Sequence, residues 1–291
     1  MLDSNTKRLW ILTTLVVVSV SCITWVSYLF QKRALQTKTE AYKTSILGSQ
    51  SSQSTSLEFV IPSLTPTYTP TPTPTAFAKE IIFGHSVMGK EIKGYEIGYG
   101  NETILLFGSI HGNEKGSQDL LDRFIIELKQ NPTLVSSQKK IIIIPMLNPD
   151  GFYDRTDKLN AHGVNIDLNF PTKEWKQYGT NGTYAGKAPY SEPESIIIST
   201  IVQTYEIKKM VSFHAHGAVI IPEDNDVSRA AAKEYAKDGG YRFYGGSMDF
   251  FGNPTQWFVE TTGYPAFTVE LSDNFNSDWI KNKKALEKLV E

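Results

Sequence analysis

The sequence predicts an α/β domain built on one mixed, largely parallel β-sheet flanked by helices. From residue 76 onward, short apolar runs alternate with segments of helical period, as in a sheet covered by helices. The run at 140–146 is apolar throughout, which is typical of a central strand buried on both faces. A separate uncharged segment predicts one transmembrane helix. We therefore expect a tail at 1–8, a membrane anchor at 9–30, a stalk at 31–75 and a single folded domain at 76–291.

The charge and cysteine content bear on the class of protein. The 291 residues carry a formal net charge of -2 and no basic block, so nucleic-acid binding has no support. The one cysteine, Cys22, lies in the first apolar segment, and the rest of the chain therefore forms no internal disulfide. That fits either a cytosolic protein or a bacterial surface protein. We expect a monomer.

The segment at 9–30 has the length and composition of a membrane span. Twenty-two helical residues at ~1.5 Å each cover about 33 Å, enough for a hydrocarbon core of about 30 Å. A cleaved signal peptide is the alternative, because Lys7 and Arg8 precede the apolar run. The apolar sequence continues to Phe30, which favours a retained signal anchor.

A Thr/Pro-rich stretch at 62–75 predicts an extended spacer. In the polyproline conformation, at ~3.1 Å per residue, it would be about 43 Å long. Such spacers usually hold a domain away from an outer cell surface, so we expect the folded domain outside the membrane. The positive-inside rule weakly favours the opposite orientation, because more cations follow the apolar segment than precede it.

Periodicity assigns the elements of the folded part in order. A hairpin is expected at 81–83 and 91–97, and a long functional loop at 148–190. Further strands are expected at 103–110, 140–146, 210–214, 218–221 and 266–271. Helices are expected at 114–130, 191–207, 227–237 and 280–289. The second helix would begin with a capping box at 191–194.

Two histidines and a glutamate lie where predicted strands end. His111 and Glu114 are three residues apart around Gly112, which permits the turn that lets both side chains converge. His214 ends the run 210–214, and ligands bind at the carboxyl ends of strands in such sheets. Alone, each histidine is more typical of an ordinary surface or core position. Together the three residues supply the ligands of a zinc hydrolase, which leaves a fourth position for water.

His216 is an alternative to His214, because residues two apart in a strand face the same side. We favour His214, since it directly ends the apolar run and Gly217 indicates that the chain is already turning. His216 is then expected to line the pocket.

Glu270 ends the apolar run 266–270. A carboxylate there is costly to bury without a partner. A structural ion pair is one interpretation. The other is a general base beside the metal, with a pKa raised by its apolar neighbours.

With these residues, the chain resembles the zinc carboxypeptidase family typified by pancreatic carboxypeptidase A, over 81–271. Its compact length and the HGNE sequence look most like the bacterial murein-peptide amidases of that family. Six segments occur in the family's order: HxxE at 111–114, NPDG at 148–151, GVNIDLNF at 163–170, SFH at 212–214, GGSMD at 245–249 and TVE at 268–270. The resemblance implies one zinc ion held by His111, Glu114 and His214, with Glu270 as general base.

Two departures concern the substrate. The family's asparagine–arginine clamp for a terminal carboxylate falls on Asp167 and Leu168, which offer no bidentate cation. Asp167 would instead attract an amino group, such as that of a diamino acid. The family's aspartate that orients a zinc-bound histidine falls on Asn165, which still accepts a hydrogen bond.

The resemblance also suggests residues that contact the reacting group. Lys158, with Arg155 as the alternative, falls near the family's oxyanion-stabilising arginine, although a solvated loop charge is the plain alternative. The family's mobile tyrosine falls on Tyr241, with Tyr244 as competitor and core packing as the alternative for both. Met248, in the GGSMD segment, is expected to contact substrate.

These observations predict a membrane-anchored, extracytoplasmic zinc peptidase of the carboxypeptidase type. It would hydrolyse an amide bond in small extracellular or cell-wall peptides by a zinc-activated water. One alternative is a zinc amidohydrolase acting on N-acyl amino acids, which would generally lack the NPDG and GGS segments. Another is an inactive family member that serves as a binding module.

Overall fold

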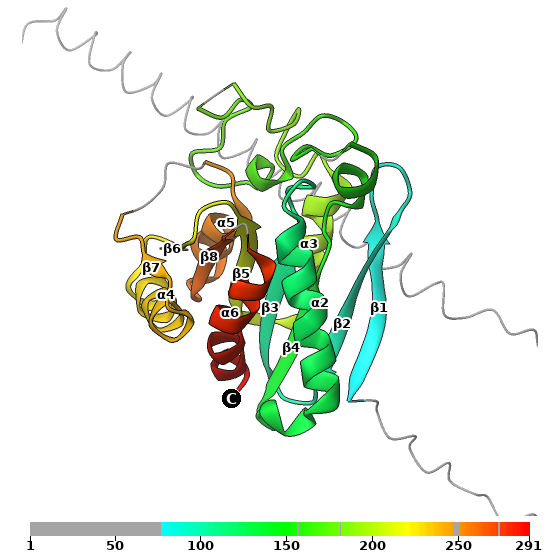
Figure 1. Ribbon diagram of the computed structural model, residues 1–291. Coiled ribbons are helices and arrows are strands. Elements are labelled where there is room, and N and C mark those ends of the chain that lie inside the picture. The colour runs from blue at the N-terminus through cyan, green and yellow to red at the C-terminus, as the bar shows by residue number, and fades with distance from the viewer. Residues whose placement is uncertain (1–76, 156, 181, 247–250, 273) are drawn as a thin grey trace, which may run out of the picture. The chain divides into compact units, whose positions relative to one another are not determined.

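The computed structural model describes residues 77–155, 157–180, 182–246, 251–272 and 274–291 (Figure 1). Within these residues, no helix is long and apolar enough to cross a membrane. The predicted anchor, the predicted stalk and Met248 lie outside the described residues.

The domain is built on one mixed sheet, as predicted, and this sheet has eight strands. Its strand order is β1-β2-β4-β3-β5-β8-β6-β7. The central strands β4, β3, β5 and β8 are mutually parallel, whereas β2 and β6 run antiparallel to their neighbours β4 and β8. The strands are Ala78–His85 (β1), Glu91–Gly98 (β2), Glu102–Gly108 (β3), Lys139–Ile144 (β4), Ile207–Ala215 (β5), Val219–Pro222 (β6), Arg242–Phe243 (β7) and Ala266–Leu271 (β8).

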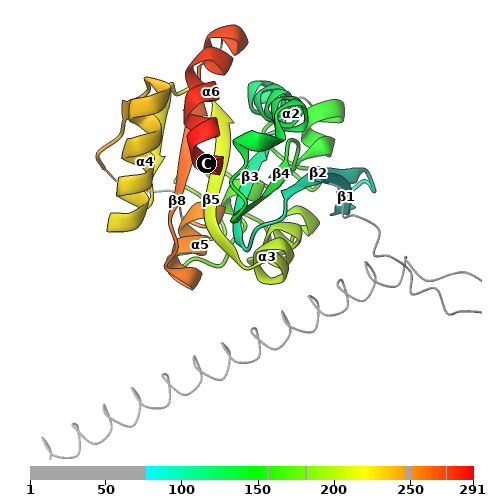
Figure 2. The ribbon, with the colours of Figure 1, turned by 90° about the horizontal axis from the view of Figure 1, so that it is seen from below.

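Helices cover both faces of the sheet. Figure 2 shows α2, α4 and α6 on one face and α3 and α5 on the other. The central strands are therefore buried on both sides, which explains their continuous apolar runs. The helices are Lys115–Gln130 (α2), Pro193–Tyr205 (α3), Asp226–Gly239 (α4), Pro254–Thr262 (α5) and Phe275–Val290 (α6).

Helix α2 illustrates how the pattern of the sequence determines the packing. Its buried side chains recur with helical spacing and join the main hydrophobic core above β3, β4 and β5. The buried apolar residues are Leu120, Leu121, Phe124, Ile125 and Leu128.

Two local predictions were wrong. The capping box at 191–194 does not form: the N-cap of α3 is Glu192, which makes no side-chain capping bond, and Pro193 occupies the first turn. The Ser191 hydroxyl instead donates to Glu192 Oε1 and accepts from Asn169 Nδ2. Helix α5 was also missed, because its nine residues give too short a periodic signal; it begins at a cap in which Asn253 Oδ1 accepts from the Gln256 N–H.

The parallel strands begin at one edge of the domain and end at the opposite edge. At the edge where they begin, the Gly98 N–H donates to Phe77 O and the Ser136 N–H donates to Val290 O. The described chain therefore both enters and leaves the domain there. The long 148–190 loop gathers at the opposite edge, where the parallel strands end (Figure 1).

Candidate metal centre and substrate pocket

His111 and Glu114 lie in a tight turn between β3 and α2. The chain leaves β3 through Ser109, whose φ of 47° is left-handed. The Ser109 N–H donates to Ser117 Oγ at 2.8 Å, and the Ser117 hydroxyl donates to Glu114 O at 2.8 Å. Because this serine pair is buried and fully bonded, the turn is fixed at both ends.

The NPDG segment supports this turn from outside. A Cβ atom on Gly112 would lie 2.1 Å from the carbonyl carbon of Gly151, so the two glycines allow a backbone contact that no side chain permits. The Asn148 amide donates to Ile110 O at 3.2 Å, and its own oxygen accepts from the Gly151 N–H. This packing gives the NPDG segment a structural role beside the ligands.

His214 and Glu270 are placed by strand register. They are direct partners on the adjacent parallel strands β5 and β8, so both side chains emerge on one face of the sheet. A Cβ on Gly217 would come within 2.6 Å of Glu270 Cβ, so the chain after β5 turns closely over the glutamate.

Three ligand atoms converge at this edge. Glu114 Oε1 lies 2.8 Å from His111 Nδ1, Glu114 Oε2 lies 3.1 Å from His214 Nδ1, and the two Nδ1 atoms are 3.3 Å apart. Two nitrogens bound at about 2.05 Å to a tetrahedral ion would be separated by about 3.3 Å. The two imidazoles and the carboxylate therefore fit the donor set and spacing of a zinc site, and the group is recognisable as a metal-binding cluster.

The charges of these ligands support one another. Burial alone would raise the pKa of the Glu114 carboxyl, but His214 and His111 outweigh it and hold that pKa far below its usual range. Burial would likewise lower the pKa of His214, yet Glu114 and Asp167 raise it. The carboxylate and the two imidazoles are therefore close enough to stabilise one another's charged forms.

Two further side chains orient the histidines. Asn165 Oδ1 lies 3.0 Å from His111 Nε2, and it also accepts from the Asp167 N–H at 3.1 Å. The hydrogen bond expected of Asn165 is thus present. Ser212 Oγ lies 2.9 Å from His214 Nε2, a partner that the sequence pattern did not indicate.

A pocket opens beside the three ligands and contains several of the predicted residues. Lys158, Asp167, Leu168 and Glu270 all line it. Burial raises the pKa of the Glu270 carboxyl; His214 opposes this shift, and the charges of Glu114 and Asp167 add to it. The full lining is His111, Lys158, Asn165, Asp167, Leu168, Gly179, Thr180, Thr183, His214, Ile221, Pro222, Glu223, Phe251, Asn253, Thr268 and Glu270.

Glu223 is a pocket residue that the sequence pattern did not reveal. It directly follows β6, and Thr255 Oγ1 donates to its Oε1 at 2.6 Å. Burial raises the pKa of Glu223 to about 7, and the charge of Asp167 adds to the shift. The only signal in the sequence is its place at a strand end, and two nearby aspartates make the segment look like an ordinary solvated turn.

The structure does not bring every predicted residue to the pocket. His216 is exposed, has a left-handed φ of 79° and is absent from the lining. The Tyr241 ring packs in the main core, where its hydroxyl donates to Asp278 Oδ1 and accepts from Asn282 Nδ2. Tyr244 likewise does not line the pocket. The side chain of Arg155 is not described, and Met248 lies outside the described residues.

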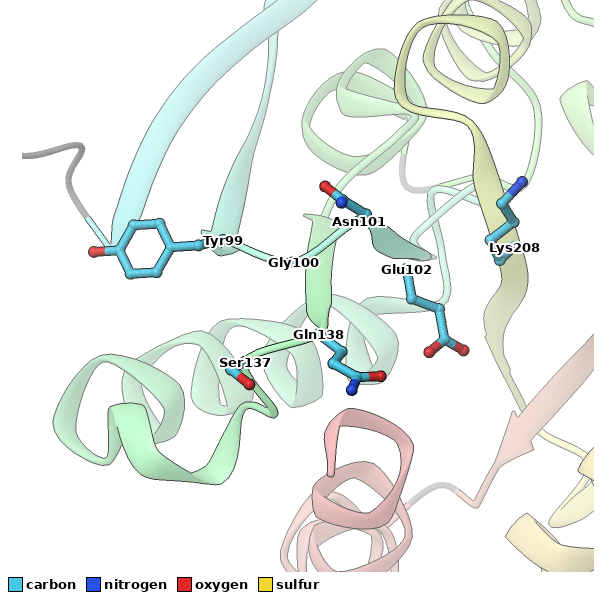
Figure 3. A pocket seen from close by; sticks show the side chains of 7 residues that line it. All are labelled: Tyr99, Gly100, Asn101, Glu102, Ser137, Gln138 and Lys208. Atoms are coloured by element: carbon cyan, nitrogen blue, oxygen red, sulfur yellow. The ribbon is translucent and has the colours of Figure 1, made fainter.

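A second hollow lies at the opposite edge of the sheet (Figure 3). Its lining consists of Tyr99, Gly100, Asn101, Glu102, Ser137, Gln138 and Lys208. The side chains of Tyr99 and Lys208 point away from each other, and this lining holds none of the candidate ligands. The chemistry therefore belongs to the pocket at the carboxyl ends of the parallel strands.

With this geometry established, residues 73–238 match the zinc carboxypeptidase family, Peptidase M14. The chain belongs to this family. The matched residues contain His111, Glu114 and His214, and the family's metal is zinc. Glu270 lies beyond the match, so its role rests on the strand register and the pocket.

Relatives of known name agree with this assignment. The chain is 24% identical over 243 residues to a gamma-D-glutamyl-L-diamino acid endopeptidase of Lysinibacillus sphaericus, covering 66% of this chain and 60% of the relative. It is 26% identical over 145 residues to murein peptide amidase A of Escherichia coli K12, covering 45% of this chain and 57% of the relative. The chain thus spans less than two thirds of the length of these curated relatives.

Solved structures show the same fold. Murein-tripeptide amidase from Escherichia coli O157 superposes with a TM-score of 0.58 at 20% identity, covering 72% of this chain and 91% of that chain. Bovine thrombin-activatable fibrinolysis inhibitor superposes with a TM-score of 0.62 at 19% identity, covering 74% of this chain and 87% of that chain.

Proposed function

We propose that this chain is a zinc-dependent peptidase that hydrolyses an amide bond in small cell-wall or other extracellular peptides. The observation that carries the proposal is the pairing of His214 with Glu270. A metal ligand and a buried carboxylate stand opposite each other on adjacent strands and line one pocket. The names of the bacterial relatives above support the choice of cell-wall peptides as substrate class.

Glu270 is the general base in this proposal. Its raised pKa brings the carboxylate closer to the range in which it accepts a proton from the attacking water and returns it to the leaving amine. Zinc, when bound, supplies Lewis-acid chemistry that polarises the scissile carbonyl and makes a water more acidic. Asn165 and Ser212 hold the two histidine rings in orientation.

Lys158 is the one lysine or arginine among the lining residues that the structure describes. Its ammonium group stabilises the negative charge that develops on the carbonyl oxygen. Leu168 lines the place where a carboxylate clamp would be expected, and it offers no positive charge. The proposed enzyme is therefore a peptide amidase rather than one that selects a free terminal carboxylate.

We also propose that residues 9–30 anchor the protein in the cell membrane, with the folded domain outside. The chain enters the domain at the edge opposite the pocket. Fractionation combined with protease protection of the full chain tests the orientation.

The decisive experiment uses the full chain purified in detergent. Zinc content is measured first, and then the protein is screened against peptides, muropeptides and N-acyl amino acids with Glu270→Gln as control. We expect about one zinc per chain and cleavage of peptides that Glu270→Gln largely abolishes.

Absence of stoichiometric zinc would falsify the proposal. Cleavage restricted to N-acyl amino acids would replace it with a deacylase. Zinc without hydrolysis of any class would indicate a binding module.

A further inference from the structure

Carboxylates outnumber lysines and arginines in the lining of the pocket beside the metal centre. Asp167, Glu223 and Glu270 all line it, whereas Lys158 is the single lysine or arginine among its described lining residues. The charge of Glu114 adds to the same field. A pocket of this kind attracts cations and repels carboxylates.

Glu223 has no role in the proposed hydrolysis. It lies on the β6 side of the pocket, where its N–H donates to Ala266 O and Thr255 orients one carboxylate oxygen. Asp167 lies on the 148–190 loop, at the other wall, with its N–H held by Asn165. Thr255 thus positions the Glu223 carboxylate, whereas the Asp167 carboxylate lies 3.7 Å from His214 Nε2.

The two carboxylates face one low-dielectric space. Both side chains belong to the lining of one pocket, and burial and then the charge of Asp167 raise the pKa of Glu223. Two such groups repel each other unless a cation lies between them. A ligand cation placed there would stabilise both and would leave Glu270 available as the base.

The rest of the wall suits an aliphatic stem. Ile221, Pro222, Phe251 and Leu168 line the same pocket and present apolar surface. Methylene groups packed there would carry a terminal charge to the carboxylates.

We propose that Asp167 and Glu223 together bind a primary amine at the end of an aliphatic side chain of the substrate. The preferred substrate class is then a peptide that contains a diamino acid such as lysine. This inference rests on the proposed peptidase function, to which it adds two specificity-determining residues.

Matched probes test the inference. Binding of L-lysinamide and of L-norleucinamide, which differ by the amine, is measured by calorimetry on the zinc-loaded full chain. Cleavage is compared for gamma-D-glutamyl-L-lysine and gamma-D-glutamyl-L-norleucine. The wild type is expected to prefer the lysine member of each pair at least tenfold.

Glu223→Gln is expected to reduce that preference about tenfold, and Asp167→Asn is the second variant in case the first does not fold. Asp224→Asn is the matched control, because Asp224 is adjacent, exposed and paired with Arg229 outside the pocket. Zinc content and circular dichroism establish that each variant is folded.

The outcomes separate this inference from the peptidase proposal. The amine site would be overturned if the lysine and norleucine probes were bound and cleaved equally well. It would also be overturned if both folded variants kept the wild-type preference for the lysine probes, even if peptides are cleaved. Charge-dependent lysinamide binding without cleavage of any peptide would support the amine site while the peptidase proposal fails.

Discussion

The metal centre and the wall of the substrate pocket are built in different ways. His111, Glu114, His214 and Glu270 lie within a few residues of strand ends, where register and short turns place them. The wall comes from the 148–190 loop and from the segments after β6 and before α5. We therefore expect the centre to carry the hydrolytic chemistry and the wall to set the substrate preference.

The largest expected effect is that of replacing Glu270, the proposed base. Glu270→Gln should lower kcat by about 10²–10⁴-fold, because Gln accepts no proton. Zinc content should not change, since Glu270 is not one of the three clustered ligands. Steady-state kinetics and metal analysis of the same preparation check both statements. A kcat within a few-fold of wild type would exclude Glu270 as the base.

A smaller effect is expected at the residue that orients His111. Asn165→Ala removes the acceptor at His111 Nε2 and should weaken zinc affinity about 10- to 100-fold. Competition with a chelator measures this. Asn165→Asp is the matched control: it keeps the acceptor and should bind zinc at least as tightly as wild type. Equal loss in both variants would show that Asn165 acts through the loop and not through the histidine.

The role of the pocket wall is tested by introducing the family's asparagine–arginine pair, which binds a terminal carboxylate. The double change Asp167→Asn with Leu168→Arg should lower kcat/KM for amine-bearing peptides about tenfold, because a carboxylate is lost and a cation is added. The new arginine should improve binding of peptides with a free terminal carboxylate. Kinetics on both substrate kinds measure the change. Undiminished cleavage of amine-bearing peptides would contradict a role of Asp167 in amine recognition.

The same contrast explains what sequence could predict. Strand ends follow from hydrophobic runs, so the sequence indicates His111, Glu114, His214 and Glu270 as site residues, and the fold brings them together. Residues on the wall depend on chain segments that meet only in three dimensions.

Two misplaced or missed residues illustrate this limit. The position of Tyr241 in the motif suggested a catalytic tyrosine, but its hydroxyl is satisfied by Asp278 and Asn282 of α6, about 40 residues later. The sequence did not predict Glu223 as a pocket residue, because its partner Thr255 lies in a helix too short to predict. No local pattern in the sequence predicts such long-range hydrogen bonds.

The smallest effect on catalysis is expected from Glu194, which fastens the long loop to the sheet. Its carboxylate accepts from the Val87 N–H at 3.4 Å and from the Asn160 amide at 3.2 Å, and the residue is fully buried. Burial raises the pKa of Glu194 from 4.5 to about 7. The folded state therefore binds this proton more tightly than the unfolded state does.

The sign of the pH dependence follows from this shift. The stabilising contribution of protonated Glu194 is complete below pH 4.5 and is lost as the pH rises to about 7, by up to about 3 kcal/mol. Glu194→Gln cannot ionise, so its free energy of unfolding relative to wild type should increase across that window and level off above it. Denaturant unfolding of the full chain at several pH values measures the difference, with exposed Asp224→Asn as control. A difference independent of pH would mean that the loop is held by neutral packing around Asn160 rather than by the protonation of Glu194.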